Sequence, residues 1–285
     1  MDTSIGVAAA LAASASYSGA VAMQAYEARQ VPVRHLLRPS LIQHLATRPL
    51  WLAGACTGVL GWCLQMFALG YAPLTLVEPV LATALITLLV IGTTVLREHV
   101  GRWEVLATLL VVSGVVGVAL SAPTHSATHL RGALAGLSIA VLASIVLAPH
   151  LIGPTRTPAA LIAISAGVAY GVVALLTKFA SDDLAYHKWS GFMVWVVMVV
   201  VFGGLGLLSE MSALRSSAIT RVAPTVFGLN VFVPVALAPA LAGEAWTGSP
   251  LHAAAIAASL AAVVAGVVVL GRSHALGAAL RSQTT

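Results

Sequence analysis

The chain has 285 residues, of which 59% are hydrophobic and only 8% are charged, and its formal net charge is +5. A soluble globular domain carries roughly 25% charged residues, so this composition excludes an ordinary soluble protein. The excess positive charge lies in short segments between apolar runs, where it sets membrane orientation and does not indicate nucleic-acid binding.

Apolar segments long enough to cross a bilayer follow one another along the chain. The sequence therefore predicts an all-α polytopic membrane protein with about nine transmembrane helices. We interpret the N-terminal stretch as the first of these helices and not as a signal peptide, because it has no basic region. The expected helices span residues 3–26, 50–70, 74–96, 103–121, 131–150, 159–178, 189–212, 217–242 and 250–271.

Basic residues are distributed unevenly between the two sets of connecting segments. With the N-terminus outside, ten arginines fall on the cytoplasmic side, and only Arg131, Lys178 and Lys188 fall outside. The positive-inside rule then predicts a multi-pass protein of the cell (inner) membrane, with the N-terminus outside and the C-terminus in the cytoplasm.

The first connecting segment, VRHLLRPSLIQHL, combines basic residues with apolar residues at helical spacing. Leu36, Leu37, Leu41, Ile42 and Leu45 would form one apolar stripe. We expect a short interfacial helix lying on anionic lipid, with a surface for a partner protein as the alternative.

Two parts of the chain share a sequence pattern. The run TLVEP at 75–79 recurs as TRVAP at 220–224. Each follows a related run at the same spacing, QMFAL at 65–69 and EMSAL at 210–214. Self-similarity of this kind indicates two copies of one membrane unit.

One extra helix between two four-helix units would bring the second unit into the membrane from the opposite side. We therefore expect inverted repeats related by an axis in the membrane plane, with the functional site between them. The expected division of this single membrane domain is a first repeat at 1–121, a linking helix at 122–158 and a second repeat at 159–285.

The chain resembles the drug/metabolite transporter (DMT) superfamily in four features. It has the four-plus-one-plus-four plan, a proline early in helices 74–96 and 217–242, an acidic residue closing each of these two helices (Glu98 and Glu244), and a glycine-rich helix after each of them. The stretch YAPLTLVEPVLATALI and the helix count look most like its NIPA-type magnesium transporter branch, with the EamA-type exporters second. The resemblance covers nearly the whole chain and implies a transporter that works by alternating access.

Polar residues inside apolar helices cost free energy and usually mark a pathway. We expect Glu78 to face a central cavity and to bind a proton or cation, with an interfacial acid at a helix start as the alternative. Pro79 frees the backbone carbonyl of Thr75, which would join the same site.

Three further residues, Asn230, Tyr17 and Tyr170, are candidates for the cavity wall, with ordinary helix packing as the alternative reading of each. The cavity itself is expected between the helices at 3–26, 74–96, 159–178 and 217–242.

Two charged residues, Glu210 and Arg221, lie near the inner ends of their helices. We expect them either to form an interfacial ion pair or to reach the cytoplasmic interface separately, and the alternative is an inner gate in which the pair forms in one state and breaks in the other. Gln65 corresponds to Glu210 in the first repeat and would take the corresponding position in an outer gate, with a hydrogen bond between helices as the alternative. We expect Glu98 and Glu244 to cap helix ends.

The sequence contains no metal-ligand spacing such as HExxH, no phosphate-binding glycine loop and no nucleophile elbow. We therefore expect no enzymatic activity, no cofactor and no metal centre.

The predicted function is proton- or cation-coupled transport of a small metabolite or amphipathic compound. The alternatives are a NIPA-like permease for magnesium or another divalent cation, and a membrane scaffold that transports nothing. The expected partners are the solute or ion and the lipid bilayer, with a homodimer left open.

Overall fold

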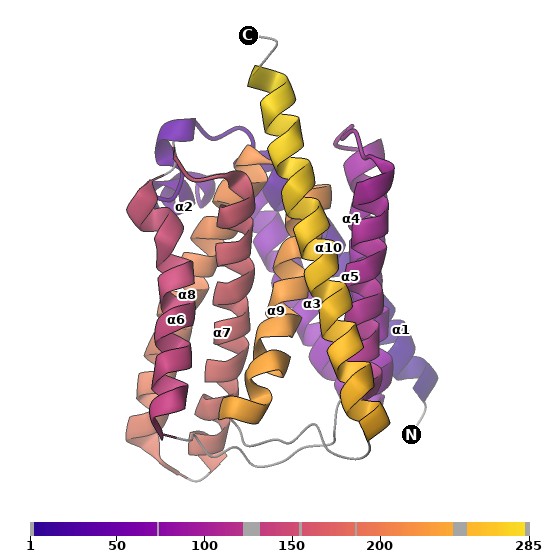
Figure 1. Ribbon diagram of the computed structural model, residues 1–285, viewed down its shortest axis with the longest axis vertical. Coiled ribbons are helices and arrows are strands. Elements are labelled where there is room, and N and C mark those ends of the chain that lie inside the picture. Colours follow the sequence, from indigo (N-terminus) through magenta and orange to yellow (C-terminus); the bar gives the residue numbers. More distant parts are fainter. Residues whose placement is uncertain are drawn as a thin grey trace.

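The computed structural model describes residues 3–72, 74–121, 132–153, 156–185, 187–241 and 250–282. The regular elements within these ranges are helices (Figure 1). They are α1 (Thr3–Ala28), η1 (Val33–His35), α2 (Pro39–Leu45), α3 (Pro49–Tyr71), α4 (Leu74–Thr94), α5 (Arg102–Ser121), α6 (Gly132–Ile152), α7 (Ala159–Ala185), α8 (Trp189–Ser216), α9 (Ile219–Leu241) and α10 (Pro250–Ser282).

Each of the nine predicted segments is a helix in the structure, α1 and α3 to α10, and most predicted ends lie within a few residues of the observed ones. The exceptions are α7 and α10, which continue well past residues 178 and 271. Seven helices in the described ranges are long and apolar enough to cross a membrane, while α4 and α6 contain the shorter apolar stretches Val80–Thr94 and Ser138–Ile152. The chain is therefore an all-α polytopic membrane protein.

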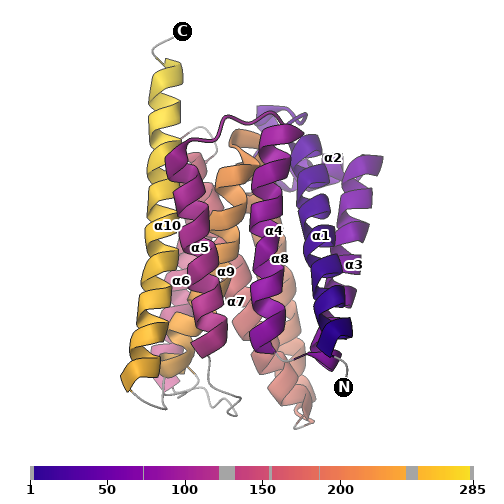
Figure 2. The same cartoon turned by 90° about the vertical axis from the view of Figure 1, so that its right-hand side faces the viewer.

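The helices pack into two groups, one around α1 and one around α7, and the two groups contact each other. Helix α1 packs against α3 and α4, and α7 packs against α8 and α9 (Figures 1 and 2). Between the groups, α5 packs along α10, and α4 contacts α9. Helix α6 packs mainly against α7, at the edge of the bundle. The start of α1 and the end of α10 lie at opposite ends of the molecule (Figure 1).

Glycines bring the backbones of α5 and α10 into contact at two points. A Cβ atom added to Gly114 would lie 2.6 Å from the carbonyl oxygen of Ser259, and one added to Gly266 would lie 2.7 Å from the carbonyl oxygen of Ala107. Small residues allow such approach between membrane helices, where dispersion contacts hold the helices together. These positions therefore set the distance between the two helices.

The short helix α2 folds against the bundle. Leu41 and Leu45 are fully buried, and together with Leu37 they belong to the same core cluster as Met211 of α8. The Leu37 amide also donates a hydrogen bond to the hydroxyl of Ser212 at 2.9 Å. The helix was predicted correctly, but the expected lipid contact is wrong. Apolar spacing identifies the buried face of a helix without identifying what covers it, and here the cover is protein.

Replacing Gly114 by Ala should lower the free energy of unfolding by about 1–3 kcal/mol, because the new methyl group would push against the backbone of α10. Thermal unfolding of the purified protein in detergent measures this change. Gly204→Ala is the matched control, since no atom lies within 4 Å of a Cβ added there. Equal unfolding midpoints for the two variants would contradict the close contact between α5 and α10.

Candidate functional site

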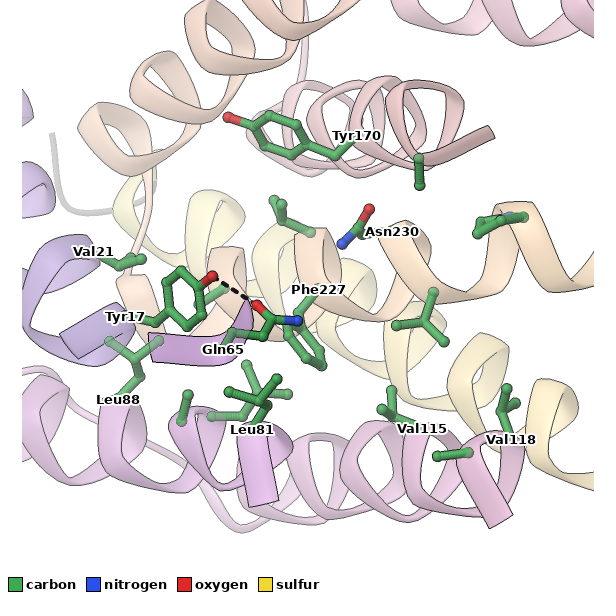
Figure 3. Close-up of a pocket in the computed structure, with 18 of the residues that line it drawn as sticks. Tyr17, Val21, Gln65, Leu81, Leu88, Val115, Val118, Tyr170, Phe227 and Asn230 are labelled. Carbon is green, nitrogen blue, oxygen red and sulfur yellow. Dashed lines mark hydrogen bonds between the residues drawn. The ribbon is translucent and has the colours of Figure 1, made fainter. Parts of the chain in front are cut away.

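A cavity of about 610 Å³ lies between α1, α3, α4, α5, α7, α8 and α9 (Figure 3). Its volume falls in the range of small-molecule sites, about 300–1,000 Å³. Leucine, valine and alanine side chains form most of its wall. The polar side chains on the described part of the wall are Tyr17, Gln65, Tyr170, Glu210 and Asn230.

The two tyrosines on this wall are held in the same way. Tyr17 on α1 donates its hydroxyl to Oε1 of Gln65 on α3 at 2.7 Å (Figure 3). Tyr170 on α7 donates its hydroxyl to Oε2 of Glu210 on α8, also at 2.7 Å. Both pairs join the first helix of a predicted repeat to the second, so the hydrogen-bonded positions correspond in the two repeats.

Each tyrosine ring lies on a glycine one helical turn before its hydrogen-bond acceptor. A Cβ atom added to Gly61 would lie 3.2 Å from the Tyr17 ring, and one added to Gly206 would lie 3.1 Å from the Tyr170 ring. The absence of a side chain at these glycines leaves room for the rings. The shared spacing of glycine and acceptor therefore explains why both rings take equivalent positions.

The structure brings five of the predicted site residues together. Tyr17 and Gln65 lie on one side of the cavity, while Tyr170 and Asn230 approach from another (Figure 3). Glu210 completes this polar group on the wall. The helices expected around the cavity, α1, α4, α7 and α9, line it together with α3, α5 and α8. A role for these residues in binding or gating stays a prediction.

The residues predicted to form the ion site lie at the beginning of α4. Thr75, Glu78 and Pro79 belong to this helix. Their side chains lie outside the part of the chain that the structure describes, so a coupling site at Glu78 also stays a prediction.

In this structure Glu210 and Arg221 do not form the predicted ion pair, and a role for Arg221 in gating stays a prediction. Arg221 Nε instead donates to Oε1 of Glu104 on α5 at 2.6 Å, while Glu210 accepts the hydrogen bond from Tyr170. The Glu104 side chain is only 5% exposed, and the amide of Gly101 also donates to it. Arg221 lies in the first turn of α9 and Glu104 in the first turn of α5, and these two helices contact each other.

A second acidic residue near the same end of the bundle caps α9. Glu98, in the segment after α4, accepts hydrogen bonds from the amides of Ile219 at 2.8 Å and Thr220 at 3.1 Å, and from the Thr220 hydroxyl at 2.8 Å. It also pairs with Arg29 at the end of α1. The first amides of a helix have no partner within that helix and attract negative charge. The expected capping role of Glu98 is thereby confirmed, whereas Glu244 lies outside the described residues.

Comparison with known proteins gives the family of the chain. Residues 1–148 match the family described as Magnesium transporter NIPA. The chain belongs to the NIPA magnesium transporter family. The match runs from α1 into α6, which covers the first predicted repeat and most of the linking helix. This family is one of membrane transporters.

This NIPA-family chain also has a relative that matches most of its length. An uncharacterized protein of Corynebacterium glutamicum is 23% identical to it over 261 residues, which cover 88% of the chain and 89% of the relative. No solved structure matches the chain. The similarity to this relative therefore extends across both predicted repeats.

Sequence reasoning about this NIPA-family chain missed Glu104, although a signal was available. Glu104, Thr108, Val111 and Val115 follow one another at helical spacing, and all four are buried on one face of α5. An acidic residue in phase with the apolar face of a helix needs a partner inside the protein. The spacing alone could have placed Glu104 on the buried face, but not opposite Arg221.

Removing one member of the Glu104–Arg221 pair should cost about 3–5 kcal/mol of unfolding free energy, because the other charge stays buried without a partner. Glu104→Gln, Arg221→Gln and the double variant form a double-mutant cycle. In thermal unfolding the double variant should lose much less than the sum of the two single variants. A second cycle, with Glu210→Gln and Arg221→Gln, is the control and should be additive. Additivity in the first cycle would refute the pair.

Proposed function

We propose that this protein is a secondary transporter that moves a small solute through the central cavity by alternating access. The observation that carries this proposal is the cavity, because α1, α3, α4 and α5 line it from the first predicted repeat and α7, α8 and α9 from the second. A site between two repeats can be exposed to either side of a membrane when the repeats rock against each other. A scaffold that transports nothing would need no cavity shared by the two predicted repeats.

The contacts between α5 and α10 support inverted repeats. Gly114 on α5 lies against Ser259 on α10, and Gly266 on α10 lies against Ala107 on α5. Each glycine comes seven residues after the residue that the other glycine contacts. A pseudo-twofold axis that exchanges α5 and α10 would exchange these two contacts.

The tyrosine pairs are consistent with the same axis. The Tyr17–Gln65 and Tyr170–Glu210 hydrogen bonds join corresponding helices of the two predicted repeats. The proposed repeats are residues 1–121 and 159–285, joined by a linking helix within 122–158.

The chemistry of the cavity favours a small metabolite or an amphipathic compound as the solute. Glu210 is the one carboxylate on the described part of the wall, and Gln65 and Asn230 add amide groups. A few polar groups on a mostly apolar wall can orient a solute whose apolar part contacts the rest of the cavity. In this proposal Glu78 provides the coupling site for a proton or cation.

Magnesium is the second candidate, because the family match favours it. Mg²⁺ prefers several oxygen ligands and usually keeps some of its waters in proteins. Within the described ranges no three His, Cys, Asp or Glu side chains come close enough to hold a metal ion together. A magnesium ion in this cavity would therefore keep most of its waters, and these waters would contact Glu210, Gln65 and Asn230.

The proposed location is the cell (inner) membrane, with the N-terminus outside. The end of the bundle where α8 stops and α9 begins carries Arg29, Arg97, Arg215 and Arg221. Basic residues collect on the cytoplasmic side of membrane proteins, which supports a cytoplasmic position for this end.

Filling the cavity should stop transport. Ala119 is 6% exposed and lies on the cavity wall, so the larger side chain of Ala119→Trp should abolish most of the flux. Flux is measured in proteoliposomes that contain magnesium-sensitive and pH-sensitive dyes, and small metabolites are screened as solutes. Val200→Trp, at a position 68% exposed on the outside of α8, is the control and should keep wild-type flux. Wild-type flux in Ala119→Trp would contradict a path through the cavity. If no solute moved in the wild type, the scaffold would be the better explanation.

Neutralising the coupling group should separate coupled flux from exchange. Glu78→Gln should lower flux driven by a proton or cation gradient by about tenfold or more, which corresponds to about 1.4 kcal/mol of lost stabilisation. Solute exchange without a gradient should change less. Glu78→Asp keeps the charge and serves as the control. Gradient-driven flux that is unchanged in Glu78→Gln would assign Glu78 a structural role and leave Glu210 as the next carboxylate to test.

A further inference from the structure

A second cavity of about 570 Å³ lies at the end of the bundle where α8 stops and α9 begins. It is separate from the central cavity and shares no lining residue with it. Glu98 is the one acidic residue on the described part of its wall. Four arginines from different parts of the chain meet there, and we call this site the arginine pocket: Arg29, Arg97, Arg215 and Arg221.

The arginine pocket has more positive than negative charge. Glu98 and Glu104 each pair with one of its arginines. Arg97 and Arg215 form no ion pair with any other residue that the structure describes. Arg215 Nε donates to the Val31 carbonyl at 2.6 Å, which holds the side chain in place without neutralising it. Two guanidinium charges therefore remain uncompensated by the described part of the chain.

The backbone turns sharply to form one wall of this pocket. Arg97 has a left-handed backbone conformation with φ of 52°, which is uncommon for a residue other than glycine. The next amide, that of Glu98, donates to the Gly92 carbonyl at 2.8 Å and closes the turn after α4. Residues held in such conformations cluster at functional sites. The turn places Arg97, Glu98 and His99 together on the wall.

We propose that the arginine pocket binds a phosphate group. An arginine carries five N–H donors in a planar fork that matches the oxygens of a phosphate. A phosphate monoester has a charge of about −1.5 to −2 near neutral pH, which matches the two uncompensated guanidinium groups. The first amides of α9 are already bonded to Glu98, so the phosphate binds through Arg97 and Arg215 and not through the helix N-terminus.

The phosphate belongs either to a lipid head group or to a soluble phosphorylated compound. The pocket lies at the end of the bundle where α8 stops and α9 begins, and head groups lie at the ends of helices that span a bilayer. Its volume of about 570 Å³ also leaves room for the body of a phosphorylated metabolite beside the phosphate. Both sources present the same chemistry to the guanidinium groups, so the experiment must tell them apart.

Titration calorimetry on the full-length protein in a neutral detergent tests this proposal. Pyrophosphate represents the soluble source and dioctanoyl phosphatidic acid the lipid source. Dioctanoylglycerol has the same acyl chains without the phosphate and should not bind. Binding of pyrophosphate assigns a soluble ligand, and binding of phosphatidic acid alone assigns a lipid head group. Absence of binding by both phosphate probes would overturn the proposal.

Matched variants test whether the probe binds in this pocket. Arg97→Gln combined with Arg215→Gln should weaken binding about tenfold or more, because charge-assisted hydrogen bonds are lost. Arg34→Gln combined with Arg156→Gln removes the same charge from exposed positions outside the pocket and should bind as the wild type does. Equal weakening in both would show attraction to net charge alone and would also overturn the proposal. If the double variant does not fold, Arg97→Gln alone, which changes an exposed side chain, is compared with Arg34→Gln alone.

Discussion

Polar groups buried in an apolar bundle must find partners inside the protein, and the start of α9 shows how this requirement organises the structure. A carboxylate, a guanidinium group or a helix amide that folding removes from most of its water contacts costs free energy unless another protein group bonds to it. Glu98 accepts hydrogen bonds from the amides of Ile219 and Thr220, and the next residue, Arg221, pairs with Glu104. Two carboxylates from the segment after α4 and from α5 thus hold the first turn of α9. Because α9 forms a wall of the central cavity, these contacts also position the candidate transport site.

The same requirement shapes the cavity. Tyr17 with Gln65, and Tyr170 with Glu210, satisfy each other across neighbouring helices. A solute that binds there competes for these groups, and exchange of one hydrogen bond for another costs less free energy than leaving a buried polar group unpaired. The two pairs differ in one respect, since Gln65 is neutral and Glu210 can carry a charge. The two tyrosine pairs therefore make the same kind of hydrogen bond, but only the pair with Glu210 can bring a negative charge to the cavity wall.

The proposed transport site and the arginine pocket meet on α9. Arg221 faces the pocket at the beginning of this helix, and Asn230 lies on the cavity wall further along it. Movement of α9 during alternating access would alter both sites, so ligands at the two sites would influence each other's binding by reciprocal linkage. The family match covers the first half of the chain, and α9 lies in the other half. The arginine pocket uses residues from both halves, and this makes it a property of the assembled bundle.

The sequence by itself determined which segments become helices, because hydropathy and the thickness of a bilayer set the length of a spanning segment. The repeated pattern also led to Tyr17 and Tyr170, which lie on the first helix of each predicted repeat. Only the tertiary structure decided that Arg221 meets Glu104 and that protein covers Leu41. Apolar spacing reports the buried face of one helix at a time. The partner of a buried charge depends on how the helices rotate and cross, and contacts between residues far apart in the chain fix that geometry.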